Sequence, residues 1–275
     1  MTTLRRPATR YSADMPDVSR EAFQAQLSQS WLKRAVKARI KRWVGTNNAE
    51  VREAWVEQKL GELPTGYRLL DAGAGELQYK RFCGHLKYVS QDFGQYTGVG
   101  DGSGLQTGTW DNARTDIICD ITKIPEPDGS FDAILCIEVL EHLEAPIEAL
   151  REFGRLLRPA GVLILTAPFA SLTHFSPYHF YSGFNRYFYT RWLERLGFKI
   201  EELVPNGNFF EFLCQELGRV GSVAKTYTRN KGALNVFENV ARVVCLRALK
   251  RLSSQNAGSE DLLCFGYFVK AVRNV

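Results

Sequence analysis

The segment best suited to binding a ligand through its backbone is a glycine turn just after residue 72. The apolar run 68–72 contains Asp71 near its end and leads directly into a turn with Gly73 and Gly75. Glycine lets the backbone bend sharply and approach a ligand closely, because it has no Cβ atom. We therefore expect this turn to bind a ligand.

The charges around this turn favour a cationic ligand. Asp71 and Glu76 flank the turn, with no Lys or Arg between them. The pyrophosphate-binding pattern GxGxxG also fails here, because position 78 is Gln. S-adenosylmethionine, which carries a sulfonium and an ammonium group, fits this charge pattern.

Two further acids end the next two apolar runs. Asp92 follows the run 88–91, and Asp120 follows the run 116–119. The carboxyl ends of parallel strands meet at one edge of a sheet, where ligands bind. We expect Asp92 to accept hydrogen bonds from ribose hydroxyls and Asp120 to accept one from an adenine amino group.

A second group of reactive side chains is Glu138, Glu141 and His142. On a helix opening after the fourth strand, these three would share one face. Two carboxylates and an imidazole beside a cofactor could ligate a divalent cation. The alternative is that Glu141 and His142 only cap and pack the helix.

The segment 167–186 is rich in aromatic residues and follows the fifth strand. Loops at this edge bind ligands in open α/β sheets, so the segment is predicted to form the wall for an acceptor. His174 or His179 would act as a general base for an acceptor hydroxyl. Packing under a long loop would explain the aromatic residues equally well.

Alternating strand and helix patterns must position these groups. Strands are predicted at 68–72, 88–91, 116–119, 131–136, 162–167, 198–203 and 262–272, and helices at 50–60, 144–157 and 189–196. The alternation predicts an α/β fold, a Rossmann-like, doubly wound, mostly parallel sheet of seven strands. A helical insertion at 209–258 precedes the last strand.

The domain organisation is predicted from the same patterns. Residues 66–275 form the main domain, preceded by a polar tail at 1–20 and a helical extension at 21–65. Residues 30–44 form a basic amphipathic helix, which would contact anionic lipid or a polyanionic substrate, or would only cap the domain. In the insertion, residues 237–252 are again apolar on one side and basic toward the end.

The bulk composition limits the environment and the partners. The formal net charge is +5, which does not indicate nucleic acid as a partner. The six cysteines include no CxxC pair and predict buried free thiols in a reducing cytoplasm. No run of eighteen apolar residues occurs, so we expect a cytoplasmic protein whose peripheral membrane contact, if any, is through 30–44.

Taken together, these motifs resemble the class I S-adenosylmethionine-dependent methyltransferases of the type 11 group. The resemblance covers residues 66–203 and rests on these segments: DAGAG at 71–75, Asp92, CDITKIP at 119–125, FDAILCIEVLEHL at 131–143 and LLRPAGVLILTAPF at 156–169. One departure is Leu77, where the family often has a third glycine.

The resemblance implies a role for each matching residue. The methionine end of the cofactor would be held by the turn after the first strand, at Asp71, Ala72, Gly73 and Gly75. Asp92 would hold the ribose, Asp120 with Ile121 the adenine, and Glu138 would lie beside the amino-acid moiety. The ExxEH string is also similar to metal sites of plant small-RNA ribose methyltransferases. By that likeness Glu138, Glu141, His142 and His179 would bind Mg²⁺, with Glu141, His142, His174 and His179 as the catalytic candidates.

The expected function is O-methylation of a hydroxyl on a small polar acceptor. Likeness to polysaccharide-biosynthesis methyltransferases favours a sugar or glycan precursor as that acceptor. One alternative is an RNA ribose methyltransferase, favoured by the basic helix and opposed by the modest net charge. Another is a non-catalytic adaptor that keeps the fold and docks on membranes through 30–44.

Overall fold

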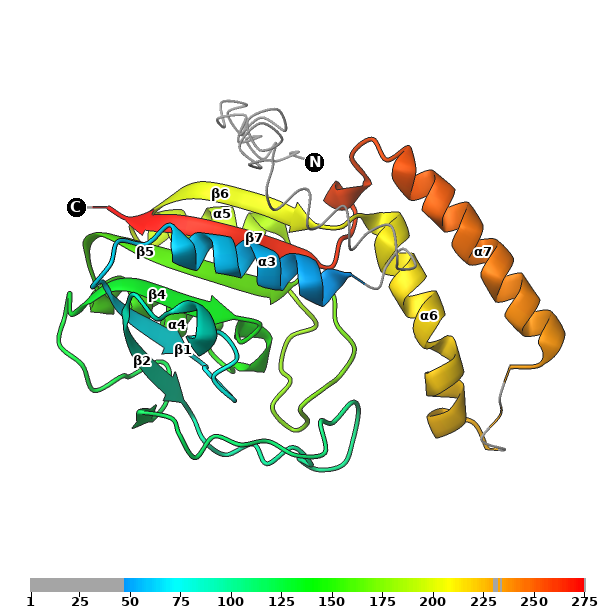
Figure 1. The fold of residues 1–275 in the computed structure, drawn as a ribbon, viewed down its shortest axis with the longest axis horizontal. Coiled ribbons are helices and arrows are strands. Elements are labelled where there is room, and N and C mark those ends of the chain that lie inside the picture. Colours follow the sequence, from blue (N-terminus) through cyan, green and yellow to red (C-terminus); the bar gives the residue numbers. More distant parts are fainter. Residues whose placement is uncertain (1–46, 230–231, 233, 275) are drawn as a thin grey trace, which may run out of the picture.

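A seven-stranded sheet forms the centre of the molecule, with strand order β3-β2-β1-β4-β5-β7-β6. The computed structural model describes residues 47–229, 232 and 234–274 (Figure 1). The strands are β1 (Arg68–Ala72), β2 (Lys87–Asp92), β3 (Ile117–Ile118), β4 (Phe131–Ile137), β5 (Leu157–Pro168), β6 (Phe198–Asn206) and β7 (Gly266–Arg273). The helices are α3 (Asn48–Gly61), α4 (Pro146–Leu156), α5 (Arg186–Arg195), α6 (Phe209–Tyr227) and α7 (Val236–Ser254), with short 3-10 helices at Lys80–Phe82, Leu140–His142 and Ser259–Asp261.

The strand pairing confirms the predicted fold class. Strands β1 to β5 pair in parallel, whereas β7 runs antiparallel to both β5 and β6. The closing strand begins at Gly266, four residues later than predicted, because the 3-10 helix Ser259–Asp261 and a short coil precede it.

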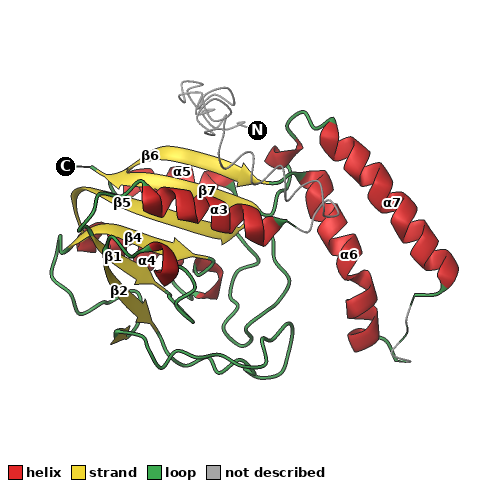
Figure 2. Cartoon of the chain, viewed as in Figure 1, coloured by secondary structure: helices red, strands yellow, loops and turns green. Residues whose placement is uncertain are grey.

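Both faces of the sheet are covered, which explains the apolar character of β4. Side chains alternate along a strand, so Ala133 and Leu135 pack toward α3, while Ile134 and Cys136 pack toward α4 and α5. Figure 2 shows α3 in front of the sheet, with α4 and α5 behind it. On the front face Trp55 of α3 stacks on Phe268 of β7, with 5.0 Å between ring centroids.

The expected alternation of strands and helices is interrupted between β2 and β3. Residues 93–116 form a long loop without a helix. Glycines are frequent in this loop, and six of them have positive φ: Gly94, Gly98, Gly100, Gly102, Gly104 and Gly108. A right-handed helix cannot contain such backbone angles. The segment is an irregular loop that lies along the edge of the sheet where ligands bind.

The insertion before the last strand is an antiparallel hairpin of α6 and α7, which stands beside the sheet (Figure 1). Asn208 caps α6, and Asn235 with Glu238 forms a capping box on α7. None of the described helices is long and apolar enough to cross a membrane.

The N-terminal predictions fall mostly outside the described residues. The tail at 1–20 and the basic amphipathic helix at 30–44 lie entirely outside them, whereas the helix expected at 50–60 is α3. All six cysteines are free, and four of them are buried as expected. Cys245 is an exception, because α7 presents it to solvent.

Candidate active site

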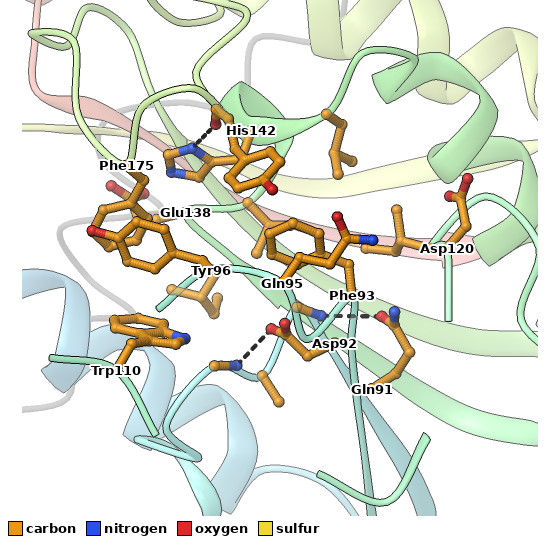
Figure 3. Close-up of a pocket in the computed structure, with 18 of the residues that line it drawn as sticks. Gln91, Asp92, Phe93, Gln95, Tyr96, Trp110, Asp120, Glu138, His142 and Phe175 are labelled. Carbon is orange, nitrogen blue, oxygen red and sulfur yellow. Dashed lines mark hydrogen bonds between the residues drawn. The ribbon is translucent and has the colours of Figure 1, made fainter. Parts of the chain in front are cut away.

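A cavity of about 1110 Å³ opens at the carboxyl ends of the parallel strands. The turn after β1, the residues after β2 and β3, and Glu138 after β4 all line it. Figure 3 shows Asp92, Asp120, Glu138 and His142 around this space. The parallel sheet therefore brings together most of the side chains that the sequence singles out.

The glycine turn forms one wall of the cavity. Gly73 and Gly75 have φ values of 76° and 49°. A Cβ atom on Gly73 would lie 2.5 Å from a methyl group of Val139, and one on Gly75 would lie 2.5 Å from the Trp110 ring. The packing of Val139 and Trp110 against the turn therefore leaves no room for a larger residue at these two positions.

Asp92 ties the turn to the end of β2. Its Oδ2 accepts from the amide of Gly75 at 3.0 Å, and its Oδ1 accepts from the amide of Gly94 at 2.9 Å. Each carboxylate oxygen keeps a second lone pair, so Asp92 can still accept from two ligand hydroxyls. Its place on the cavity wall fits a bound ribose.

The far end of the cavity combines an acid with apolar side chains. Asp120 accepts from the amide and the hydroxyl of Thr122, both at 2.8 Å. Ile121 and Phe93 line the same region, and Phe93 packs edge-on against Tyr178. Apolar side chains and a hydrogen-bond acceptor thus line this end of the cavity, a combination that suits an adenine ring.

Asp71 lies beneath the cavity and is not one of its lining residues. The carboxyl is 2% exposed, and the hydroxyl of Tyr88 donates to its Oδ2 at 2.5 Å. Burial raises the pKa of Asp71 to about 7, despite the hydrogen bond from Tyr88. Ala72, also predicted to contact the cofactor, is fully buried in the core beside it.

Arg52 is a cavity residue that the sequence analysis missed. It comes from α3, and its guanidinium donates to Oε2 of Glu138 at 2.9 Å. The turn itself has no Lys or Arg between Asp71 and Glu76, so Arg52 supplies a cation from a distant part of the sequence. No local pattern links Arg52 to the glycine turn, because only the packing of α3 on the sheet brings them together.

Glu138 does not lie on a helix, contrary to the prediction. Its φ is 55°, and it forms a tight turn between β4 and the 3-10 helix Leu140–His142. Thr166 of β5 donates to its Oε1 at 2.8 Å, while Arg52 binds its other oxygen. Both carboxylate oxygens of Glu138 are thus bound by other side chains at the cavity wall.

Glu141, His142 and His174 form a compact cluster of metal-binding type. Their ligand atoms lie within 4.8 Å of one another. The Nε2 atoms of His142 and His174 are 3.7 and 4.0 Å from the same oxygen, Oε1 of Glu141. His142 also lines the large cavity, so the cluster borders the cofactor space.

Backbone contacts fix the orientation of both imidazoles. Nδ1 of His142 lies 2.6 Å from the carbonyl oxygen of Tyr178, and Nδ1 of His174 lies 2.8 Å from that of Leu172. A carbonyl oxygen only accepts, so each Nδ1 carries the proton and donates it. Each Nε2 therefore presents a lone pair toward Glu141, as in metal sites.

Burial keeps His142 neutral, which is the protonation state that a metal ligand requires. Burial, and then the neighbouring His174, lower the pKa of His142 to about 3. Burial, and then the charge of Glu138, raise the pKa of Glu141 well above its usual value. Oε2 of Glu141 is buried without a hydrogen-bond partner among the described residues, which a cation would correct.

The cluster differs from the metal-ligand set expected from the sequence. His174 takes part, whereas Glu138 binds Arg52 and Thr166, and Nε2 of His179 lies 3.1 Å from the hydroxyl oxygen of Ser171. The His179 ring is still close, with its centroid 4.8 Å from that of His174. His179 thus lies next to His174 but is not a member of the cluster.

Two loops far apart in sequence hold His174 in place. Leu105 pairs with His174 in an isolated parallel bridge, and the amide of Phe175 donates to the carbonyl of Leu105. The amides of Phe180 and Tyr181 donate to the carbonyl of Glu141. These backbone hydrogen bonds of the 93–116 loop and of Glu141 thereby keep the 169–185 loop next to the cluster.

Aromatic rings cover the cavity above the glycine turn. Tyr96 stacks on Phe175 at 4.5 Å between centroids, and Trp110 meets both rings edge-on. Phe175, Tyr178 and Phe180 come from the predicted acceptor segment and do line the cavity. Tyr96 and Trp110 come from the 93–116 loop, which carries no motif that would have indicated them.

Comparison with known proteins agrees with this architecture. Residues 70–165 match the family model of a methyltransferase domain. Over 82% of its length the chain superposes on 94% of a SAM-dependent methyltransferase from Archaeoglobus fulgidus, with a TM-score of 0.50 and 15% identity. The predicted fold is therefore confirmed, and the match to the methyltransferase domain is limited to residues 70–165.

Sequence relatives match a shorter segment. A ubiquinone biosynthesis O-methyltransferase of Xanthomonas oryzae is 38% identical over 63 residues, which are 23% of this chain and 26% of that protein. Its counterpart from Xanthomonas axonopodis is 31% identical over 106 residues, which are 38% of this chain and 44% of that protein. The chain therefore spans less than half the length of these relatives.

Proposed function

We propose that this chain, which carries a methyltransferase domain of the class I fold, transfers the methyl group of S-adenosylmethionine to a hydroxyl of a small acceptor. The observation that carries the proposal is the shared cavity. The glycine turn, Asp92 and Asp120 line it on one side, and His142 of the Glu141 cluster lines it on the other.

The residues around the cavity fit each part of the cofactor. Asp92 would accept from the ribose hydroxyls, and Phe93, Asp120 and Ile121 would surround the adenine. At the opposite end Glu138 would face the ammonium group, and Arg52 would face the carboxylate of the methionine moiety. Arg52 thus adds a cation to the acids that the sequence indicates around the turn.

The Glu141, His142 and His174 cluster fits a divalent cation. The fit rests on the orphaned oxygen of Glu141 and on two imidazoles that present Nε2 lone pairs. Two nitrogen ligands and one oxygen ligand suit Mn²⁺, Fe²⁺ or Zn²⁺ better than the Mg²⁺ considered from the sequence. When bound, such an ion would lower the pKa of an acceptor hydroxyl next to the methyl donor.

The remaining contribution of the protein is alignment and the exclusion of water. Methyl transfer is an in-line displacement, so its rate depends on holding the acceptor oxygen close to the sulfonium. The rings of Tyr96, Trp110 and Phe175 cover the cavity above the cofactor space and would exclude water there.

A small acceptor with two adjacent hydroxyls is the substrate class that this site favours. Two neighbouring oxygens could bind one cation together, as in a sugar diol or a catechol. The name of the ubiquinone O-methyltransferase relatives supports transfer to oxygen. A glycan acceptor stays an expectation from the sequence, because none of the relatives compared above is named for glycans.

Transfer of a labelled methyl group from S-adenosylmethionine tests the proposal. Purified protein loaded with Mn²⁺ or Zn²⁺ should methylate diols or catechols and should spare analogues with a single hydroxyl. Glu141→Gln should abolish transfer while cofactor binding persists. Methylation of nitrogen, or equal transfer by the Glu141→Gln variant, would contradict it.

RNA is the second enzyme substrate to include in this assay. Methylation of an RNA ribose by the wild type, with binding that weakens steeply as salt rises, would favour the RNA alternative. Failure to bind cofactor at all would instead favour the adaptor alternative.

A further inference from the structure

Helix α7 has two apolar faces, and only one of them is packed. Val243, Leu246 and Leu249 lie on the half-buried side that faces α6. On the opposite side, exposed apolar or small residues recur at helical spacing: Phe237, Val240, Ala241, Val244, Cys245, Ala248 and Leu252. We call this second set the outer stripe.

The apolar side chains of the outer stripe are strongly exposed to solvent. Phe237 is 86% exposed, and Val240 and Val244 are each 58% exposed. Val236 at the start of the helix is 76% exposed. A continuous apolar row of this kind on a helix marks a contact surface, whereas single exposed apolar residues need no explanation.

Basic side chains border the outer stripe. Arg247 and Arg251 are exposed and have no ion pair within the described part of the chain, whereas Lys250 lies on the side of Val243 and Leu246. Glu238 is the single acidic residue of α7, and it is engaged in the N-terminal capping box. The surface thus combines apolar side chains with uncompensated positive charge.

The positive charge beside the outer stripe distinguishes between the partners that could bind there. A second copy would bring two basic helices together, and the basic sequence 30–44 would add six more positive charges without an acid. Both would be opposed by repulsion. RNA would match the charge but would leave Phe237, Val240 and Val244 exposed to water.

We infer that the outer stripe of α7 docks on a lipid surface that carries anionic headgroups. The apolar side chains would enter the boundary between headgroups and acyl chains, and Arg247 and Arg251 would bind the headgroups. The far end of the hairpin also touches the active-site loop, since the hydroxyl of Tyr227 donates to the carbonyl of Gly104 at 3.3 Å. A docked hairpin would therefore hold the 93–116 loop close to the lipid.

Sedimentation with vesicles tests this inference on the full chain. The vesicles contain either equal parts of phosphatidylglycerol and phosphatidylcholine or phosphatidylcholine alone. Wild-type protein should sediment with the anionic vesicles and stay in solution with the neutral ones. Each basic residue at an anionic surface contributes about fivefold in binding, so the variant R247Q/R251Q should bind about 25-fold more weakly.

Two further variants separate the apolar and the charge contributions. Phe237→Ser with Val240→Ser removes apolar area without changing charge and should also lower binding by at least about tenfold. The control R191Q/R195Q removes the same charge from exposed positions on α5 and should bind as the wild type does. All the substituted residues are exposed, and unchanged melting curves would show that each variant folds.

Several outcomes would overturn the inference. One is equal vesicle binding by the α7 variants and the wild type, which would assign lipid binding to another surface. Another is a stable dimer by light scattering that Phe237→Ser dissociates, which would make the outer stripe a contact between copies. A third is RNA binding that R247Q/R251Q loses while its vesicle binding stays unchanged.

Discussion

Nε2 of His174 lies 4.0 Å from Oε1 of Glu141, although His174 comes from the 169–185 loop and Glu141 from the 3-10 helix Leu140–His142. His142 reaches the same oxygen at 3.7 Å from the other side. The active-site hypothesis depends on this convergence, because it places a donor set of metal-binding type beside the cofactor cavity.

The first prediction concerns which histidine completes the metal site. Wild-type protein should bind one equivalent of Mn²⁺ or Zn²⁺, and His174→Ala should weaken that binding at least about tenfold, since it removes a ligand. Calorimetric titration of metal into metal-free protein measures this. His179→Ala is the matched control and should bind metal as the wild type does; the reverse order of effects would restore the ligand set expected from the sequence.

The second prediction concerns Arg52 and the amino-acid end of the cofactor. Arg52→Ala should weaken S-adenosylhomocysteine binding about 10- to 100-fold, because a hydrogen bond to a charged group contributes about 1.5–3 kcal/mol. Binding of adenosine, which has no carboxylate, should not change. Arg81→Ala, on an exposed residue paired with Glu53, serves as the control. Equal losses for both ligands would show that Arg52 supports the fold and does not bind the carboxylate.

The sequence predicted the parts of this site that lie next to strands. Gly73, Gly75, Asp92, Asp120 and Ile121 all reach the cavity, because the carboxyl ends of parallel strands determine their position. Strand alternation in 131–136 and the helix pattern of 144–157 likewise gave β4 and α4 to within a few residues.

The parts that were missed depend on contacts between distant segments. Arg52 reaches Glu138 only because α3 packs on the sheet, and His174 reaches Glu141 only because the 93–116 loop pairs with it. Glu138 was misplaced for a local reason: its left-handed backbone breaks the helix that the spacing of Glu138, Glu141 and His142 suggested.

A third prediction tests the packing of the glycine turn. Gly75→Ala should lower the free energy of unfolding by about 1–2 kcal/mol from the left-handed backbone alone, and by more from the collision with Trp110. In a Trp110→Ala background the collision is absent, so the loss should be smaller. Urea unfolding of the four proteins measures this cycle. Identical losses in both backgrounds would mean that Trp110 does not fill the space beside Gly75.

The fourth prediction concerns pH and Asp71. Its pKa is about 7 in the folded protein, against an ordinary value of 3.8, because burial disfavours the charged form. The neutral carboxyl therefore stabilises the fold fully below pH 3.8, and this contribution is lost as pH rises to about 7. Asp71→Asn keeps an acceptor for Tyr88 and cannot ionise, so it should stabilise the protein more above pH 7 than near pH 4. Unfolding curves across this range measure the difference. A constant difference between variant and wild type would show that Asp71 does not titrate in this window.

Calorimetric titration with S-adenosylhomocysteine tests the central claim, cofactor binding in the cavity beside Asp92, most directly. Wild-type protein should bind the ligand at micromolar concentrations. Asp92→Asn should bind at least about tenfold more weakly, because it removes the charged acceptor facing the ribose. The control Glu194→Gln, on an exposed acid of α5, should bind as the wild type does. No binding by the wild type, or equal binding by Asp92→Asn, would contradict the account.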